Sequence, residues 1–295
     1  MKTVLVVGAG FMGSGIAQVC AQAGYQVNLM DIKPDALDKA IKTISLSVNK
    51  LSEKGQISES PDLIIDRISG VWDLSSASAA DLVIESALEV ESLKKEIFHE
   101  LDGRAPASTP LATNTSSIPI TRIAETLKHP ERVLGLHFFG PVPLMKLVEV
   151  VKGERTSSEV FDRGIRFVKS LGKVPVRVHK DIPCFVMNRV FSAAFREAVD
   201  LVAQGIVSPE DLDVGMKLGY GWSAGPFEIA DNAGLDTILL IGKFMQAIGE
   251  TELFPKSDLI NRMVHKGRLG RKSGEGFYTY GSDGKRIPRS EKLTT

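Results

Sequence analysis

The sequence predicts an α/β protein in which a doubly wound, mostly parallel β-sheet is followed by a second, all-helical domain. Three observations lead to this prediction. Short β-branched runs alternate with amphipathic stretches over the first half of the chain, which is typical of a parallel sheet with helices on both faces. A glycine-rich turn follows the first of these runs. After about residue 181 the strand-like runs stop, and long helical patterns take their place.

Length and composition are consistent with two domains and argue against several classes of protein. The chain has 295 residues, 43% hydrophobic and 24% charged, as in ordinary globular proteins. Its 36 basic and 36 acidic residues cancel, so we expect no nucleic-acid partner bound through global charge. Cys20 and Cys184 form no CxxC pair, which favours a reducing, cytoplasmic compartment without disulfides or a metal site. We expect no membrane span and no targeting peptide.

The first domain, which we place at residues 1–181, is expected to contain a sheet of short apolar strands. The expected strands are Thr3–Val7, Val27–Asp31, Leu82–Glu85, Leu111–Asn114, Val133–Phe138, Lys146–Val151 and Val174–Val178. Helical faces between them are formed by Ile16, Val19, Cys20 and Ala23, and by Phe161, Ile165 and Val168. A long helical insertion at about 34–66 begins with a lysine- and serine-rich helix from Pro34 to about Gly55.

The second domain, residues 182–295, is expected to be helical. Val186–Gln204 has one apolar face, and Gly205 follows it where a helix C-cap is expected. Ser208 and Pro209 are typical of a helix start. Ile238–Ile248 and Leu259–Lys266 are further helical candidates.

A glycine motif connects the first expected strand to the first expected helix. It consists of Gly8, Ala9, Gly10, Phe11, Met12 and Gly13. In this context the glycines permit a tight turn, close approach to a pyrophosphate and close helix–strand packing, and the helix N-terminus attracts the phosphates. Asp31 ends the second strand, where a carboxylate binds the adenosine ribose and repels a 2′-phosphate. The alternative is a simple glycine turn, but the combination favours a Rossmann-like fold that binds NAD.

A histidine and a glutamate occur at unusual places in two expected strands. His137 ends an apolar strand, at the sheet edge where ligands bind in doubly wound folds. Glu149 lies inside another apolar strand, where an unpaired carboxylate would be costly. A strand-terminal histidine can also be purely structural. If the two groups meet, the carboxylate orients the imidazole and stabilises its cation, as a proton-transfer pair requires.

Two polar clusters remain. Asn114-Thr115-Ser116-Ser117 follows a strand at the same sheet edge. Its ordinary interpretation is an N-cap cluster for the helix expected at Ile120, a role that can coexist with ligand binding. Asn188 and Arg189 open the first long helix of the second domain, where a solvated Asn is the ordinary interpretation.

These residues occur in a set of motifs that resembles the 3-hydroxyacyl-CoA dehydrogenase family, and most closely its short bacterial 3-hydroxybutyryl-CoA members. The resemblance covers nearly the whole chain. The matching motifs are Gly8–Ala17, Asn114–Ser117, His137–Glu149, Asn188-Arg189, Gly225–Glu228 and Gly270–Tyr278.

The resemblance implies a role for individual positions. The catalytic residues would be His137 as general base, Glu149 as its partner, and Ser116 and Asn188 at the reacting oxygen. NAD would be held by Gly8, Ala9, Gly10, Phe11, Met12, Gly13, Asp31, Glu89, Lys94, Ser116, Gly140 and Lys272. Coenzyme A would be contacted by Ser47, Lys54 and Ser116, although lysines on a helix can simply face solvent.

Two positions depart from the family pattern. Gly140 stands where the family usually has Asn, and Cys184 replaces a usual Gly. Neither departure concerns His137 or Glu149, so the implied activity is reversible NAD-dependent oxidation of (S)-3-hydroxyacyl-CoA to 3-oxoacyl-CoA by a homodimer. The alternatives are a β-hydroxyacid dehydrogenase acting on a small free acid, and a catalytically silent NAD-binding oligomer.

Overall fold

The computed structural model describes residues 2–250, 252 and 254–287. The chain divides into two compact units, Met1–Phe185 and Val186–Thr295, and each is described by itself. The division falls a few residues after the expected domain boundary. None of the described helices combines the length and the apolar character that crossing a membrane requires.

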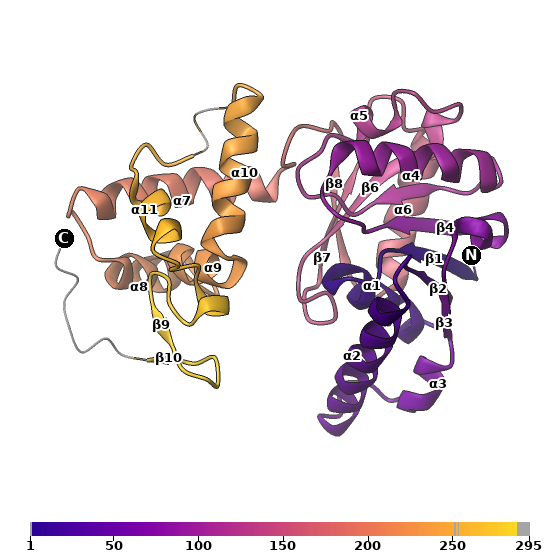
Figure 1. Ribbon diagram of the computed structural model, residues 1–295, viewed down its shortest axis with the longest axis horizontal. Helices are drawn as coiled ribbons and strands as arrows, with labels where there is room; N and C mark the ends of the chain where they lie inside the picture. The colour runs from indigo at the N-terminus through magenta and orange to yellow at the C-terminus, as the bar shows by residue number, and fades with distance from the viewer. Residues whose placement is uncertain (1, 251, 253, 288–295) are drawn as a thin grey trace. The chain divides into compact units, whose positions relative to one another are not determined.

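The first unit is built on one sheet (Figure 1). Its strands are β1 (Thr3–Val7), β2 (Gln26–Met30), β3 (Ile68–Val71), β4 (Leu82–Glu85), β5 (Leu111–Thr113), β6 (Val133–Phe138), β7 (Leu147–Val151) and β8 (Val174–Val178). Within the described residues they form an eight-stranded sheet in the order β3-β2-β1-β4-β5-β6-β7-β8. The pairs from β3 to β6 are parallel, β7 runs antiparallel to β6, and β8 is parallel to β7. The predicted doubly wound, mostly parallel sheet is confirmed.

The edge strand β3 was not predicted. Its sequence, Ile-Ser-Gly-Val, has too few apolar residues to stand out as a strand, and it becomes one by pairing with β2. Gly70 in its middle packs under helix α2 (Pro34–Glu53), since a Cβ there would lie 3.6 Å from Leu37 Cδ1. The segment interpreted as an insertion therefore leads from α2 through the short helix α3 (Pro61–Ile65) back into the sheet.

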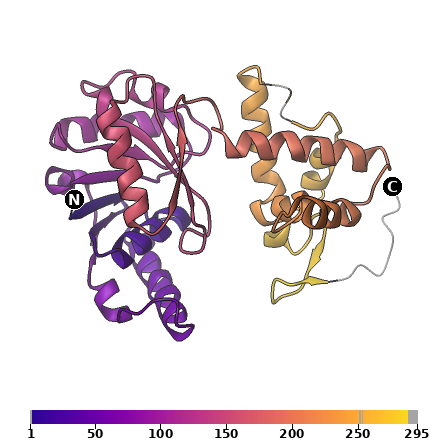
Figure 2. The same ribbon diagram turned by 180° about the vertical axis from the view of Figure 1, so that it is seen from behind.

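Helices cover both faces of this sheet (Figures 1 and 2). They are α1 (Phe11–Gln22), α2, α3, α4 (Glu91–Arg104), α5 (Ile120–Ala124) and α6 (Ser158–Ser170), with the 3₁₀ turns η1 (Leu74–Ala79) and η2 (Pro130–Arg132). Residues of α1, α2 and α6 share one apolar core with alternate residues of the strands, including Leu136 and Phe138 of β6 and Val148 and Val150 of β7. Because successive strand side chains point to opposite faces, His137 and Glu149 point to the other face of the sheet.

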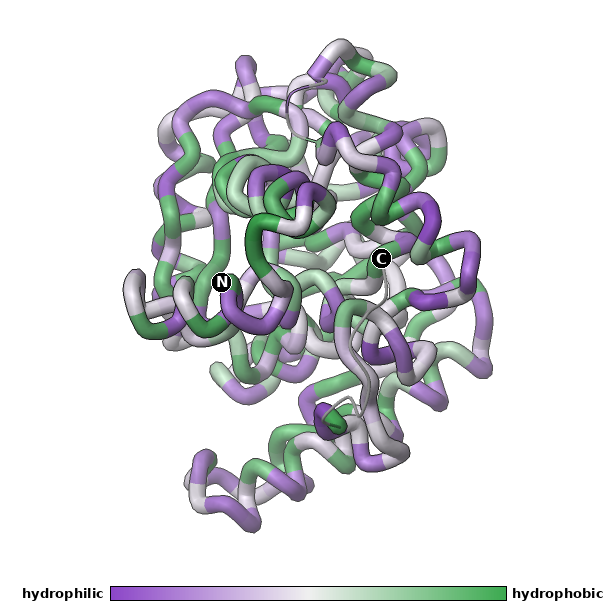
Figure 3. Tube along the Cα trace, turned by 90° about the vertical axis from the view of Figure 1, so that its left-hand side faces the viewer, coloured by the Kyte–Doolittle hydropathy of each residue, from purple (hydrophilic) through white to green (hydrophobic). Residues whose placement is uncertain are grey.

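The second unit is helical, as predicted, with one small addition. Its elements are α7 (Met187–Ala203), α8 (Pro209–Tyr220), α9 (Pro226–Ala233), α10 (Leu235–Ala247), α11 (Leu259–His265), η4 (Arg271–Ser273), β9 (Thr279–Tyr280) and β10 (Arg286–Ile287). Apolar and polar residues are interspersed along its helices (Figure 3), and the apolar ones gather around Phe195, Phe227 and Phe277. The antiparallel pair β9–β10 corrects the all-helical prediction. Each strand is only two residues long, too short to give a pattern in the sequence.

The predicted helix ends of this unit are confirmed. Gly205 follows α7 with a left-handed φ of +71°, and the amide of Ile206 donates to the carbonyl of Leu201. This is the pattern by which glycine ends a helix. Ser208 precedes α8, and its side-chain oxygen accepts a hydrogen bond from the amide of Asp211. Two buried carboxylates hold the segment at Tyr278: Asp231 accepts from the amides of Phe277 and Tyr278, and Asp213 accepts from the hydroxyl of Tyr278.

Candidate active site

His137 and Glu149 are in contact. The antiparallel register of β6 and β7 places the two residues directly opposite each other, and His137 Nδ1 lies 2.8 Å from Glu149 Oε2. Glu149 is fully buried and His137 is 5% exposed. A carboxylate can only accept, so the imidazole proton belongs on Nδ1, which leaves the lone pair of Nε2 able to take a proton. An imidazole oriented in this way is able to serve as a general base.

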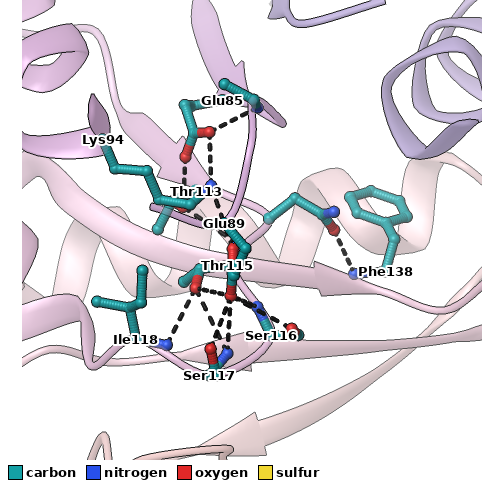
Figure 4. A network of polar contacts seen from close by, with 11 residues as sticks. Glu85, Glu89, Lys94, Thr113, Thr115, Ser116, Ser117, Ile118 and Phe138 are labelled. Carbon is teal, nitrogen blue, oxygen red and sulfur yellow. Dashed lines mark hydrogen bonds and ion pairs between the residues drawn. The ribbon is translucent and has the colours of Figure 1, made fainter. Parts of the chain in front are cut away.

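The surroundings of the imidazole are aromatic and ordered by hydrogen bonds. The ring centroids of Phe139 and Phe185 lie 4.5 Å and 5.7 Å from that of His137. The side chain of Asn114 accepts a hydrogen bond of 2.8 Å from the amide of Phe138 (Figure 4). Asn114 thus ties the end of β6 to the loop after β5, while the rings limit how far the imidazole can turn.

A buried ion pair supports the neighbouring strand ends. Lys94 of α4 and Glu85 of β4 are 1% and 0% exposed, and Lys94 Nζ lies 2.7 Å from Glu85 Oε1 (Figure 4). Glu85 also accepts from the hydroxyl of Thr113 at 2.7 Å and from the amide of Ala87 at 2.7 Å. Such burial of two charges is tolerated because each oxygen and the ammonium has partners.

Glu89 carries this network on to the loop after β5. Its Oε1 accepts from the hydroxyl of Thr115 and from the amides and hydroxyls of Ser116 and Ser117, at 2.6–3.2 Å. Lys94 Nζ lies 3.4 Å from its other oxygen. Burial alone would raise the pKa of Glu89, but the Lys94 charge and these hydrogen bonds outweigh it and hold the pKa below its usual value. Glu89 is therefore negatively charged, and in this form it holds Ser116 in place.

The capping alternative for the Asn114–Ser117 cluster is wrong. The residue before α5 is Pro119, and the serines bond Glu89 instead. The first turn of α5 is tied down by Asp181, which accepts from the amide and the hydroxyl of Thr121 at 2.7 Å and 2.9 Å.

The glycine loop fits a dinucleotide. Gly8 has a φ of +102°, and a Cβ there would lie 2.6 Å from the carbonyl oxygen of Ser86. A Cβ on Gly13 would lie 1.8 Å from the carbonyl oxygen of Gly8, so both positions require glycine for packing. At Gly10 a Cβ would meet no atom of the described residues within 4 Å, apart from the chain next to it. The protein itself therefore does not require a glycine there, which agrees with a ligand approaching the backbone at that point.

Asp31 lies against this loop. Its Oδ2 accepts a hydrogen bond of 2.9 Å from the amide of Ala9, and its Oδ1 one of 3.0 Å from the amide of Lys33. These two amides hold the carboxylate beside the phosphate-binding turn, which is where a ribose diol would be recognised. The glycine loop and the carboxylate of Asp31 together fit the phosphates and the ribose of NAD.

The absence of a side chain at Gly140 leaves room for the ring of Phe11. A Cβ at Gly140 would lie 2.7 Å from Cε1 of Phe11, whose side chain is otherwise exposed. An Asn at position 140 and this orientation of the Phe11 ring therefore exclude each other. The departure at Cys184 also has a conformational meaning, since its φ of +62° is one that glycine adopts more readily.

A cavity of about 330 Å³ lies between α1, α2 and the segment after β6. Three residues were assigned to coenzyme A by resemblance. Ser47 and Lys54 line this cavity, and Ser116 is not among its lining residues. Phe11 and a part of the β6–β7 connection, Pro141–Leu144, also line it. The last segment was not assigned a binding role from the sequence, because Val-Pro-Leu carries no polar signal.

Two predicted site residues belong to the second unit. Asn188 is near the start of α7. Lys272 lies in η4, with its Nζ 2.6 Å from Asp236 Oδ2. The roles of both residues remain predictions. No group of three or more metal-ligating side chains occurs in the described part of the chain.

Known proteins resemble this chain over almost its full length. Residues 3–182 match the family model of the 3-hydroxyacyl-CoA dehydrogenase NAD binding domain, and residues 185–280 that of the C-terminal domain. A probable 3-hydroxybutyryl-CoA dehydrogenase of Deinococcus radiodurans is 42% identical over 93% of this chain and 99% of its own. One from Bacillus subtilis is 42% identical over 95% and 98%.

A solved structure agrees. The (S)-3-hydroxybutyryl-CoA dehydrogenase of Ralstonia eutropha is 39% identical, with a TM-score of 0.89 over 96% of this chain and 100% of that one. Fold, glycine loop and matched sequence lead to the same assignment: the chain belongs to the 3-hydroxyacyl-CoA dehydrogenase family and has its NAD-binding domain.

Proposed function

We propose that this protein oxidises (S)-3-hydroxyacyl-CoA reversibly to 3-oxoacyl-CoA with NAD, and that its substrate is the short-chain 3-hydroxybutyryl-CoA. The buried contact of 2.8 Å between His137 and Glu149 is the observation that carries the reaction type. The names of the bacterial relatives support the short chain.

In this mechanism His137 Nε2 takes the proton of the C3 hydroxyl. Glu149 stabilises the imidazolium that forms, because a buried carboxylate next to Nδ1 favours the charged ring. Asn188 donates a hydrogen bond to the reacting oxygen, and Ser116 donates another when its hydroxyl turns away from Glu89, its acceptor in the structure. This contribution is large in a site closed to water. When bound by the glycine loop, Asp31, Glu89, Lys94 and Lys272, NAD supplies the two-electron oxidation of the C3 carbon.

The cavity beside α2 is proposed as the place of coenzyme A. Lys50 lines it from the same helix as Ser47, and Lys54 lines it from the position directly after that helix. Lysine side chains favour binding of phosphates. Phe11, which belongs to the glycine motif, lies at the same cavity.

Initial rates with NAD and two substrates test this function. We expect turnover of 3-hydroxybutyryl-CoA and little turnover of free 3-hydroxybutyrate. Comparable rates with the free acid would support a β-hydroxyacid dehydrogenase instead. NAD binding without turnover of either compound would indicate a catalytically silent oligomer.

Cofactor choice is a second expected result. Because Asp31 is fixed beside the loop, the protein should use NAD in preference to NADP. Asp31→Ser removes the negative charge that repels a 2′-phosphate, so the ratio of kcat/KM for NAD over NADP should fall at least tenfold. Equal use of both cofactors by the unmodified protein would contradict the ribose assignment.

We propose that the second unit forms a homodimer. Val190, Leu218, Tyr220 and Leu240 are exposed large apolar or aromatic side chains of α7, α8 and α10, and such side chains are common at protein interfaces. Light scattering should give a mass about twice the 32.0 kDa of the chain. A single-chain mass at micromolar concentration would rule the dimer out.

We also propose a reducing, cytoplasmic location. Cys20 is a free, buried cysteine, and burial raises the pKa of its thiol, which makes it unreactive.

A further inference from the structure

Lys173 is a buried lysine that the proposed mechanism does not use. It directly precedes β8 and is 8% exposed. Its Nζ donates hydrogen bonds of 2.6 Å to the carbonyl oxygens of Val142 and Met145. In the described part of the chain it forms no ion pair, whereas the other buried lysine, Lys94, pairs with two glutamates. The backbone of one turn is thus the main partner of this ammonium.

That turn joins the two strands that carry the candidate catalytic pair. It spans Pro141–Met145, and the carbonyl of Pro141 accepts hydrogen bonds of 3.0 Å from the amides of Leu144 and Met145. The turn is also packed against α1, because a Cβ on Gly15 would lie 2.8 Å from Cβ of Val142. Lys173 therefore holds the backbone of the turn by hydrogen bonds, and α1 packs against the turn at Val142.

The turn also lines the cavity that contains Ser47 and Lys54. Pro141, Val142, Pro143 and Leu144 contribute to its wall. A shift of this backbone would change the shape of the cavity. His137 and Glu149, in contrast, are held by the β6–β7 register and by their own hydrogen bond.

Burying an ammonium without a carboxylate is costly, and burial lowers the pKa of Lys173 accordingly. An apolar residue would fill the space at lower cost, but it could not bond two backbone carbonyls. Charge-assisted hydrogen bonds are among the stronger polar contacts in proteins. We propose that Lys173 is a positioning residue, which fixes the Pro141–Met145 turn as a wall of the acyl-CoA cavity and thereby sets the affinity for acyl-CoA.

This inference rests on the proposed function, and it is tested with Lys173→Met, which keeps the length of the side chain and removes its donors. Lys169→Met is the matched control, because Lys169 is an exposed lysine at the end of α6. We expect the KM for 3-hydroxybutyryl-CoA to rise roughly tenfold or more in Lys173→Met. The KM for NAD and kcat should stay near those of the unmodified protein, and Lys169→Met should change none of the three.

Hydrogen exchange gives a readout that does not depend on turnover. In Lys173→Met the amides of Leu144 and Met145 should exchange faster, while those of β6 and β7 keep their protection. An unchanged KM for acyl-CoA would overturn the proposal. A fall in kcat together with equal rises in the KM for acyl-CoA and the KM for NAD would overturn it as well, since that pattern indicates general damage to the protein.

If Lys173→Met does not fold, Lys173→Arg serves as the test. Its larger head keeps the charge but displaces the turn, so the KM for acyl-CoA alone should rise, and the same two outcomes would overturn the proposal. Absence of turnover in the unmodified protein would count against the proposed function. Normal turnover in the unmodified protein, together with an unchanged KM for acyl-CoA in Lys173→Met or Lys173→Arg, would count against the role of Lys173 and not against the proposed function.

Discussion

Replacing His137 with Gln is expected to lower turnover at least about 100-fold while NADH still binds, because loss of a general base typically costs about 10²–10⁴-fold. Gln fills much of the space of the imidazole but cannot accept and release a proton at neutral pH. In the proposal the cofactor is held by the glycine loop and Asp31. The carboxylate of Asp31 accepts from the amides of Ala9 and Lys33, so the replacement of His137 should leave NADH binding intact. Steady-state kinetics and fluorescence titration with NADH measure the two effects separately.

A second variant sharpens this test. Glu149→Gln should keep the base but remove the charge that stabilises its cation, so turnover should fall less far than in His137→Gln. Near-full turnover of His137→Gln, or loss of NADH binding, would refute the assignment of the base.

Local sequence patterns were sufficient to predict most of the sheet and the glycine loop. The buried strands are continuous apolar runs. The need for glycine is local at both positions, since Gly8 has a φ of +102° and Gly13 lies against the carbonyl oxygen of Gly8, although the contact of Gly8 with Ser86 is not. The contact between His137 and Glu149 was also foreseeable, since an ionisable group in each of two apolar strands requires a partner. The edge strand β3 was missed because its pairing with β2, rather than its composition, makes it a strand.

Contacts between distant parts of the chain could not be predicted. Glu85 and Thr113 lie in different strands, yet they bond each other in the interior. The same holds for Asp181, which ties down the start of α5, and for Lys173, which bonds a turn that lies well before it in the sequence. In each case the residue types are ordinary, and only the fold brings the partners together.

Lys94→Met is expected to destabilise the first unit by about 3–5 kcal/mol, the typical cost of breaking a buried ion pair by removing one partner. Met has nearly the length of Lys, so little packing is lost. Glu85 would keep its hydrogen bonds from Thr113 and Ala87, but its charge would be left in the interior without a cation. Thermal unfolding followed by circular dichroism should show a midpoint lower by roughly 10 °C.

Two further variants separate charge from packing. Lys95→Met, at the neighbouring position, removes a lysine whose partners Glu91 and Glu125 are partly exposed, and such pairs contribute only about 0–1 kcal/mol. The double variant Glu85→Gln with Lys94→Met leaves no buried charge at this pair, so it should regain a substantial part of the lost stability. Since Lys94 also lies 3.4 Å from Glu89, the single variant should raise the pKa of Glu89 and loosen the loop of Ser116. If Lys94→Met and Lys95→Met unfold at the same temperature, the Lys94–Glu85 pair does not stabilise this edge of the sheet.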